Sequence, residues 1–427
     1  MKEMRKMMNA IILCFVVSVI TFSCKNDSTT GTLKGTVTAS STSQSLAGVR
    51  IVVYDANTNA PIGNSVVTES NGTYEIELTP GAYYLNLSKQ GFNGIPQVGV
   101  TPVAVTVEPG KETVNNFQLQ TSNVSNGGSI TGKVTSDGKA LAGVLVVADY
   151  GTNGYSSVTG TDGTYFIYNV PAGAYLLQGF MSNYNSAQQS VGVIAGTETS
   201  DKNITMLSGA TGSVTGSVSF LATKSGEVDV TLINPLTKET IPGLVTTTVN
   251  GAYLIAKVPN GKYIVRASYL NDSYVVDPDW ILKNGEPTVT ITGAAVTQDF
   301  SVTGAVKLVS PTNSTNSTKP VEVIGLTPTF TWEDYSSTSD YVIEVSDING
   351  NVIWGGFKGG LFTKNSVFIP KTQLSIAFNA DGKATTALKS KSTYRWRIYA
   401  SKDDNSLSLG WKLISVSEEA QGLFTIK

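Results

Sequence analysis

The residues best suited to chemistry lie between positions 269 and 280, where aromatic rings and carboxylates stand close together. An exposed ring can cover the apolar face of a sugar, while carboxylates accept hydrogen bonds from its hydroxyl groups. We therefore predict that any ligand held through side chains binds here. The predicted ligand-binding residues are Tyr274, Asp277, Asp279 and Trp280. Two alternatives stay open: a loop that Trp280 fastens to a hydrophobic core, and a calcium site of Asp272, Asp277 and Asp279.

Other chemistry is weakly supported. The chain has no histidine, which removes the commonest general base and the commonest metal ligand. Residues 347–351 (Asp-Ile-Asn-Gly-Asn) look like the start of a calcium loop, but the acidic residue expected at the twelfth position is missing, so we predict a hairpin. A net charge of −2 gives no electrostatic basis for binding nucleic acid. We predict no catalytic residue, no metal site and no cofactor.

The first 23 residues have the features of a targeting segment. Basic residues precede an apolar run over residues 10–22, which ends at Ser-Cys, with the cysteine at Cys24. The pattern resembles the signal of bacterial lipoproteins, and residues 25–27 resemble the tag that sends lipoproteins of Bacteroidota to the outer face. This implies a lipid anchor at Cys24 and a location on the outer membrane, exposed at the cell surface. An ordinary secretory signal or an uncleaved anchor is the alternative.

Three glycines mark an internal repeat, since Gly72, Gly163 and Gly251 follow one another at intervals of 91 and 88 residues. Each begins a Gly-x-aromatic strand, and a turn with Pro and Gly connects it to a second strand that carries a Tyr. These intervals suit a small sandwich domain and are too long for a solenoid unit. The repeated tyrosines could stack on sugars, but their identical place in each repeat favours core packing. They are Tyr74 and Tyr83, Tyr165 and Tyr175, and Tyr253 and Tyr263.

Further features recur in the same order. Each repeat opens with a Gly-centred strand, and the first two continue with Leu-Ala-Gly-Val, at residues 46–49 and 141–144. The central glycines of the opening strands are Gly35, Gly132 and Gly216. This order resembles the carboxypeptidase regulatory-like domain over about residues 31–303, although the third repeat has Ser-Gly-Glu-Val at residues 225–228. The resemblance implies transthyretin-like, seven-stranded sandwiches that have no catalytic residues of their own.

The final segment has a different composition, because it holds four of the five tryptophans. Residues 394–400 alternate apolar and basic side chains, as a half-buried strand does, and Asn349-Gly350 is typical of a hairpin turn. The segment resembles a fibronectin type III-like or related immunoglobulin-like sandwich. We expect Trp332 and Trp396 to lie in its core.

We therefore predict an all-β chain of tandem antiparallel β-sandwiches, three transthyretin-like and one immunoglobulin-like or fibronectin type III-like. No stretch after residue 24 shows sustained helical periodicity. The predicted segments are a signal peptide (1–23), a tether (24–30), the first repeat (31–120), a linker (121–127), the second repeat (128–206), the third repeat (207–306) and the final sandwich (307–427).

These features predict a non-catalytic surface lipoprotein that binds or displays a glycan or protein ligand. Its expected partners are the membrane, through Cys24, and a glycan or surface protein. A structural stalk or scaffold subunit of a surface assembly is the alternative. A carboxylate-based glycosidase would need two acids about 5–10 Å apart in a cleft, and small sandwiches offer no obvious cleft.

Overall fold

The computed structural model describes residues 29–427, apart from 98–99, 101, 222–225, 268–273, 314–318, 359–362, 365–367 and 419–420. The predicted signal peptide, Cys24 and Asp272 lie outside the described residues. The chain is all-β, as predicted, and consists of tandem two-sheet sandwiches. Among the described residues one short helix interrupts the strands, α2 (Pro278–Asn284).

The first sandwich has sheets of order β4-β1-β8 and β3-β2-β5-β6, with β9 also on β1 and β7 on β5. Its strands are β1 (Gly31–Ala39), β2 (Arg50–Asp55), β3 (Pro61–Val67), β4 (Thr73–Leu78), β5 (Gly81–Lys89), β6 (Phe92–Ile95), β7 (Val105–Val107), β8 (Glu112–Val114) and β9 (Phe117–Leu119).

The second sandwich has sheets β11-β10-β14, with β18 and β19 also on β10, and β13-β12-β15-β17, beside a β16-β20 pair. Its strands are β10 (Gly128–Ser136), β11 (Lys139–Ala140), β12 (Leu145–Asp149), β13 (Gly154–Val158), β14 (Thr164–Val170), β15 (Gly173–Phe180), β16 (Tyr184–Asn185), β17 (Gln189–Val193), β18 (Glu198–Thr199), β19 (Ile204–Thr205) and β20 (Leu207–Ser208).

The third sandwich has sheets β24-β21-β29-β26, with β28 also on β21, and β23-β22-β25-β27. Its strands are β21 (Gly212–Phe220), β22 (Asp229–Ile233), β23 (Thr240–Thr247), β24 (Ala252–Val258), β25 (Gly261–Ala267), β26 (Tyr274–Val276), β27 (Thr288–Ile291), β28 (Ala295–Thr297) and β29 (Phe300–Gly304).

The fourth sandwich has sheets β30-β32-β38 and β31-β41-β39-β33-β34, with β37 on β33 and β40 on β39, beside a β35-β36 pair. Its strands are β30 (Leu308–Ser310), β31 (Val321–Val323), β32 (Thr329–Trp332), β33 (Asp340–Asp347), β34 (Val352–Gly355), β35 (Phe357–Lys358), β36 (Thr363–Lys364), β37 (Phe368–Pro370), β38 (Ser375–Ala377), β39 (Thr393–Asp403), β40 (Trp411–Val416) and β41 (Leu423–Ile426). As predicted, Trp332 and Trp396 are buried in its core.

One tyrosine–glycine pair recurs in the three repeats. The central glycine of each opening strand lies opposite the tyrosine of the paired strand. In the second sandwich the Tyr165 hydroxyl donates a hydrogen bond to the Lys202 carbonyl at 2.5 Å, and a Cβ on Gly132 would come within 2.4 Å of the same oxygen. Only glycine leaves room for this bond. The equivalent pairs are Tyr74 with the Asn115 carbonyl (2.6 Å) and Tyr253 with the Gln298 carbonyl (2.5 Å).

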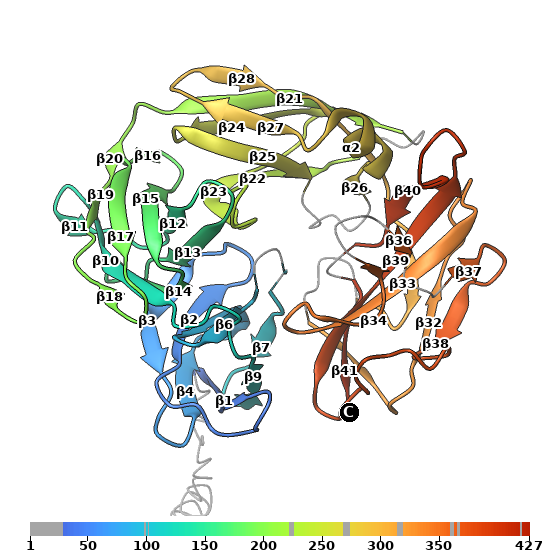
Figure 1. The fold of residues 1–427 in the computed structure, drawn as a ribbon, viewed down its shortest axis with the longest axis horizontal. Coiled ribbons are helices and arrows are strands. Elements are labelled where there is room, and N and C mark those ends of the chain that lie inside the picture. Colours follow the sequence, from blue (N-terminus) through green and yellow to red (C-terminus); the bar gives the residue numbers. More distant parts are fainter. Residues whose placement is uncertain are drawn as a thin grey trace, which may run out of the picture.

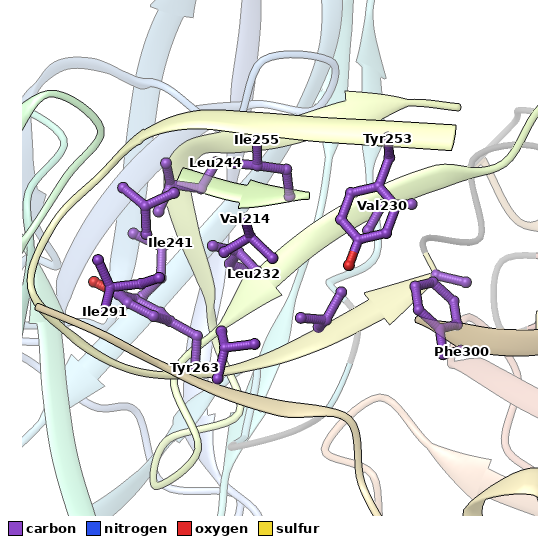
Figure 2. Packing of buried hydrophobic residues seen from close by; sticks show 14 of the residues in the cluster. Val214, Val230, Leu232, Ile241, Leu244, Tyr253, Ile255, Tyr263, Ile291 and Phe300 are labelled. Atoms are coloured by element: carbon purple, nitrogen blue, oxygen red, sulfur yellow. The ribbon is translucent and has the colours of Figure 1, made fainter. Parts of the chain in front are cut away.

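The core of the third sandwich extends into its neighbour. Figure 2 shows Tyr253, Tyr263 and Phe300 among the aliphatic side chains of this core. Leu145 and Val147 of β12 belong to the same cluster, whereas Val146 and Ala148, on the other face of β12, lie in the core of the second sandwich. Strand β12 is therefore buried on both faces, one of them by the next sandwich.

The four sandwiches follow an arc that brings the fourth back to the first (Figure 1). At the closing contact, Ile348 of the turn between β33 and β34 packs against the core of the first sandwich. The adjacent Gly350 has so little space that a Cβ would lie 2.3 Å from Val100. A weak charge attraction also links the two sandwiches. The pKa of Glu108 in the first sandwich is lowered chiefly by a hydrogen bond from Lys111, and the charge of Lys319 in the fourth sandwich lowers it slightly further.

Candidate functional site

The predicted ligand-binding residues lie where the third sandwich meets the fourth. Asp277 and Pro278 begin α2, because the Asp277 carboxylate caps the helix and accepts a hydrogen bond from the Asp279 amide at 2.9 Å. Asp277 is 3% exposed, and burial raises the pKa of its carboxyl group. Its side chain therefore faces the helix rather than solvent.

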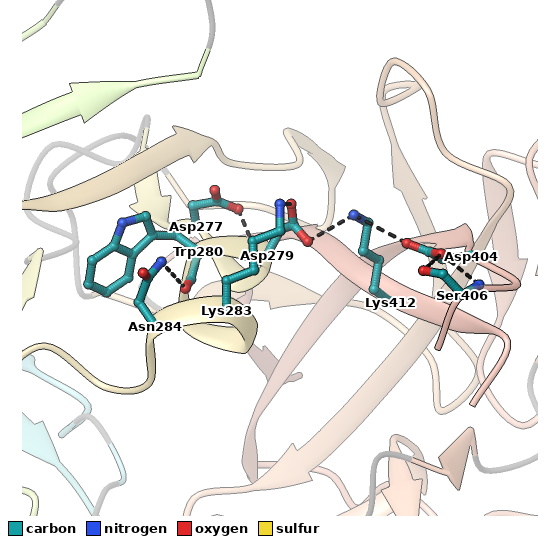
Figure 3. Close-up of polar contacts among 8 residues, drawn as sticks. All are labelled: Asp277, Asp279, Trp280, Lys283, Asn284, Asp404, Ser406 and Lys412. Atoms are coloured by element: carbon teal, nitrogen blue, oxygen red, sulfur yellow. Dashed lines mark hydrogen bonds and ion pairs between the residues drawn. The ribbon is translucent and has the colours of Figure 1, made fainter. Parts of the chain in front are cut away.

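Asp279 links the two sandwiches through ion pairs. Its carboxylate lies 2.7 Å from the Lys283 ammonium on the same helix and 2.8 Å from the Lys412 ammonium on β40 (Figure 3). Lys412 also approaches Asp404 at 3.4 Å. Burial opposes ionisation of Asp279, but hydrogen bonds from Lys283 and Lys412 outweigh it and hold the pKa of the carboxyl group below its usual range.

The two aromatic members of the predicted site pack against the third sandwich. Trp280 is partly buried against the core, and its carbonyl accepts a hydrogen bond from the side-chain amide of Asn284 at 2.9 Å. The Tyr274 ring meets the Phe220 ring edge to face, with centroids 5.1 Å apart. Of the four residues, Asp279 contacts the fourth sandwich, Asp277 caps α2, and the two aromatic residues pack on the third sandwich, so each has a structural contact. Ligand binding by them stays a prediction.

The turn at residues 347–351 is a hairpin, as predicted, since β33 and β34 pair antiparallel on either side of it. The Asp347 carboxylate accepts hydrogen bonds from the amides of Asn349 (2.8 Å) and Asn351 (2.9 Å). In the described part of the chain, no three Asp, Glu, Cys or His residues cluster as metal ligands would.

The seam between the first and second sandwiches contains a buried cation that the sequence reasoning missed. Arg50 on β2 is 5% exposed, and its guanidinium carbon lies 4.5 Å from the centre of the Phe166 ring on β14. Burial lowers the pKa of Arg50. Asn169 adds hydrogen bonds across the seam: its side chain accepts from the Gly91 amide and donates to the Phe92 carbonyl, both at 2.6 Å.

A carboxylate of the third sandwich bonds to the second and acts electrostatically on the first. Glu239 of the third sandwich accepts a hydrogen bond from the Ser156 hydroxyl of the second. Burial raises the pKa of Glu239, and the same carboxylate helps to raise the pKa of Tyr54 on β2, where burial is the larger cause. The sequence feature that could have predicted such a seam is the continuous run of apolar residues on β12. A strand that is covered on both faces does not alternate apolar and polar side chains.

Comparison with known proteins identifies one part of the chain. Residues 32–120 match the family model of the carboxypeptidase regulatory-like domain. This match covers the first sandwich, and the second and third sandwiches share its tyrosine–glycine register. A search of curated proteins finds no match. None of the described helices is long and apolar enough to cross a bilayer.

Three solved structures illustrate a distant likeness to this chain. The Bacillus anthracis TIE protein is 16% identical, with 64% of this chain and 51% of that one covered and a TM-score of 0.19. A leucine-rich repeat protein from Bacteroides thetaiotaomicron is 17% identical, with 41% and 26% covered and a TM-score of 0.24. The major pilin subunit BcpA of Bacillus cereus is 11% identical, with 65% and 100% covered and a TM-score of 0.18. The chain thus spans about half of the first protein and a quarter of the second, and scores this low carry no inference about function.

Proposed function

We propose that this chain is a non-catalytic, lipid-anchored surface protein whose four sandwiches form one stiff body that displays a binding surface outside the cell. The observation that supports a stiff body is the burial of core side chains across seams. Leu145 and Val147 of the second sandwich are part of the core of the third. Sandwiches joined in this way cannot rotate freely, because rotation would expose apolar surface to water.

The closing contact favours a compact display body over an extended stalk. A stalk needs its last sandwich far from its first, whereas Ile348 of the fourth packs on the core of the first. The carboxylates of the α2 seam support a non-catalytic role. Asp277 is committed to capping a helix and Asp279 to two lysines, so neither resembles the free acid of a glycosidase.

Small-angle X-ray scattering of the protein tests this architecture. We expect a radius of gyration within about 5 Å of the value of about 22 Å for a compact chain of this length. Ile348→Asp should increase it, because a charge at the closing contact would have to be buried. Ile324→Asp is the matched control, since Ile324 lies in the same sandwich and is 87% exposed. An extended particle for the unaltered protein would contradict the proposal.

Anchoring is tested separately. Cys24 carries the predicted lipid, and Cys24→Ser should release the protein from the membrane or leave it unprocessed. Detergent-phase partitioning and the mass of the N-terminal peptide measure this directly. An unchanged mass and unchanged partitioning would show that Cys24 is not acylated.

A further inference from the structure

A hollow of about 400 Å³ opens on the fourth sandwich, close to its seam with the third. Two loops form it: residues 333–339 between β32 and β33, and residues 371–374 between β37 and β38. The side chains that matter here are those of Asp334, Tyr335, Ser337, Lys371, Thr372 and Leu374. The hollow is separate from the α2 cluster described above.

The Tyr335 ring is held in a fixed place. It is partly buried against the core of the fourth sandwich, and its hydroxyl shares a hydrogen bond of 2.7 Å with the Thr303 hydroxyl of the third sandwich. Leu374, which packs against the same core, adds an aliphatic surface. A ring anchored at both ends offers a ligand a rigid apolar face at little cost in entropy.

Asp334 is an oriented hydrogen-bond acceptor. Its Oδ1 accepts from the Tyr341 hydroxyl at 2.8 Å, and Tyr341 is fully buried. Burial raises the pKa of Tyr341 to about 12, so this phenol stays a donor at physiological pH. Oδ2 of the exposed Asp334 receives no hydrogen bond from any residue that the structure describes. It is therefore available to a ligand.

Donors and hydroxyl groups complete the lining. Lys371 is exposed and forms no ion pair within the described ranges. Ser337 and Thr372 bring exposed hydroxyl groups, and Ser337 adopts a φ of 66°, in the left-handed region that serine rarely occupies. One carboxylate and one ammonium group balance in charge, so the hollow has no net preference for an anion or a cation.

We propose that this hollow binds one residue of a neutral saccharide. The Asp334 carboxylate accepts from its hydroxyl groups, the Lys371 ammonium donates to them, and the Tyr335 ring covers its apolar C–H face. The volume lies at the lower end of the range for small-molecule sites, about 300–1,000 Å³. This inference rests on the proposed display function and names the class of ligand displayed. Saccharide binding can be absent while scattering still shows a compact body, and scattering can show an extended body while saccharide still binds. The two experiments therefore distinguish failure of this inference from failure of the proposed architecture.

The test is binding of the purified full chain to an array of neutral and acidic oligosaccharides, followed by titration with the best neutral binder. We expect Asp334→Asn to weaken binding at least about tenfold and Lys371→Ala by about five- to tenfold, since both remove a charged hydrogen-bond partner. Asn keeps an oxygen for Tyr341, so the fold should stay intact, as a melting curve would confirm. Lys383→Ala, at an exposed lysine outside the hollow, is the control and should change nothing.

Three results would overturn the proposal. They are no binding of the unaltered protein to any neutral saccharide on the array, neutral-saccharide binding that both variants leave unchanged, and binding confined to acidic saccharides or inorganic phosphate. The last result would mark Lys371 as part of an anion site. Loss of binding in both variants, with Lys383→Ala unaffected, would establish the site.

Discussion

The interiors of the three repeats are alike, whereas the seams between the sandwiches all differ. Inside, Tyr74, Tyr165 and Tyr253 each donate to a backbone carbonyl across a glycine. The seams use three different contacts. The first seam has a buried guanidinium stacked on a ring, the second has a shared apolar core, and the third has an ion pair. The residues that repeat along the sequence therefore indicate how each sandwich packs its own core. How one unit meets the next is decided by residues that do not repeat.

The largest effect should come from breaking an interior tyrosine. Tyr165→Ala should lower the free energy of unfolding by about 3–5 kcal/mol, because it leaves a cavity in a fully buried position. Chemical denaturation monitored by intrinsic fluorescence measures it. Tyr165→Phe is the control and should cost only about 1 kcal/mol, the value of one hydrogen bond. If the alanine variant were no less stable than the phenylalanine variant, packing of the Tyr165 ring in the core would not stabilise the second sandwich.

The aromatic residue of α2 should matter less. Trp280 is only partly buried, so Trp280→Ala should cost about 1–3 kcal/mol. The same variant tests the predicted ligand site if binding to the oligosaccharide array is measured alongside the melting temperature. Weakened binding with little loss of stability would support ligand binding at α2. A loss of stability with binding intact would show that Trp280 only packs α2 against the core of the third sandwich.

The Glu239 carboxylate, at the seam between the second and third sandwiches, should make stability depend on pH. Burial raises the pKa of Glu239 in the folded protein, so the folded state holds this proton more tightly than the unfolded state. Stability should therefore fall as pH rises above the ordinary range of Glu, about 4.3. Glu239→Gln should raise the melting temperature by a few degrees at neutral pH, but not below about pH 4. An equal effect at both pH values would mean that ionisation is not the cause.

The smallest effect should come from the ion pair of the third seam. Lys412→Ala should cost about 0.5–1 kcal/mol, and less at high salt, because Lys412 and Asp279 are each about one-fifth exposed. Lys307→Ala is the matched control, since the pair of Lys307 with Glu333 is far more exposed. Comparable losses from the two variants, measured by thermal unfolding in low and high salt, would show that the seam pair is an ordinary surface contact.

The interiors could be predicted because local pattern decides them. The period of two and the Asn-Gly and Asp-Gly turns place the tyrosines in the cores, where the structure has them. Helix α2 was missed because seven residues are too few to show a helical period, although Asp277-Pro278 is a typical helix start. The hollow could not be predicted at all. Its two loops are more than thirty residues apart in the chain, and only the sheets bring them together.

The return of Ile348 to the first sandwich changes how the whole body resists opening. In an open row, one broken seam separates the units on either side, but in a closed ring a second path still joins them. A small closing contact can therefore hold, because the chain keeps its two halves at an effective concentration in the millimolar range. When one seam opens, the other seams keep its two units close together, so it can re-form, as one donor atom of a chelating ligand re-binds while the others stay bound. Each seam can therefore be weak on its own.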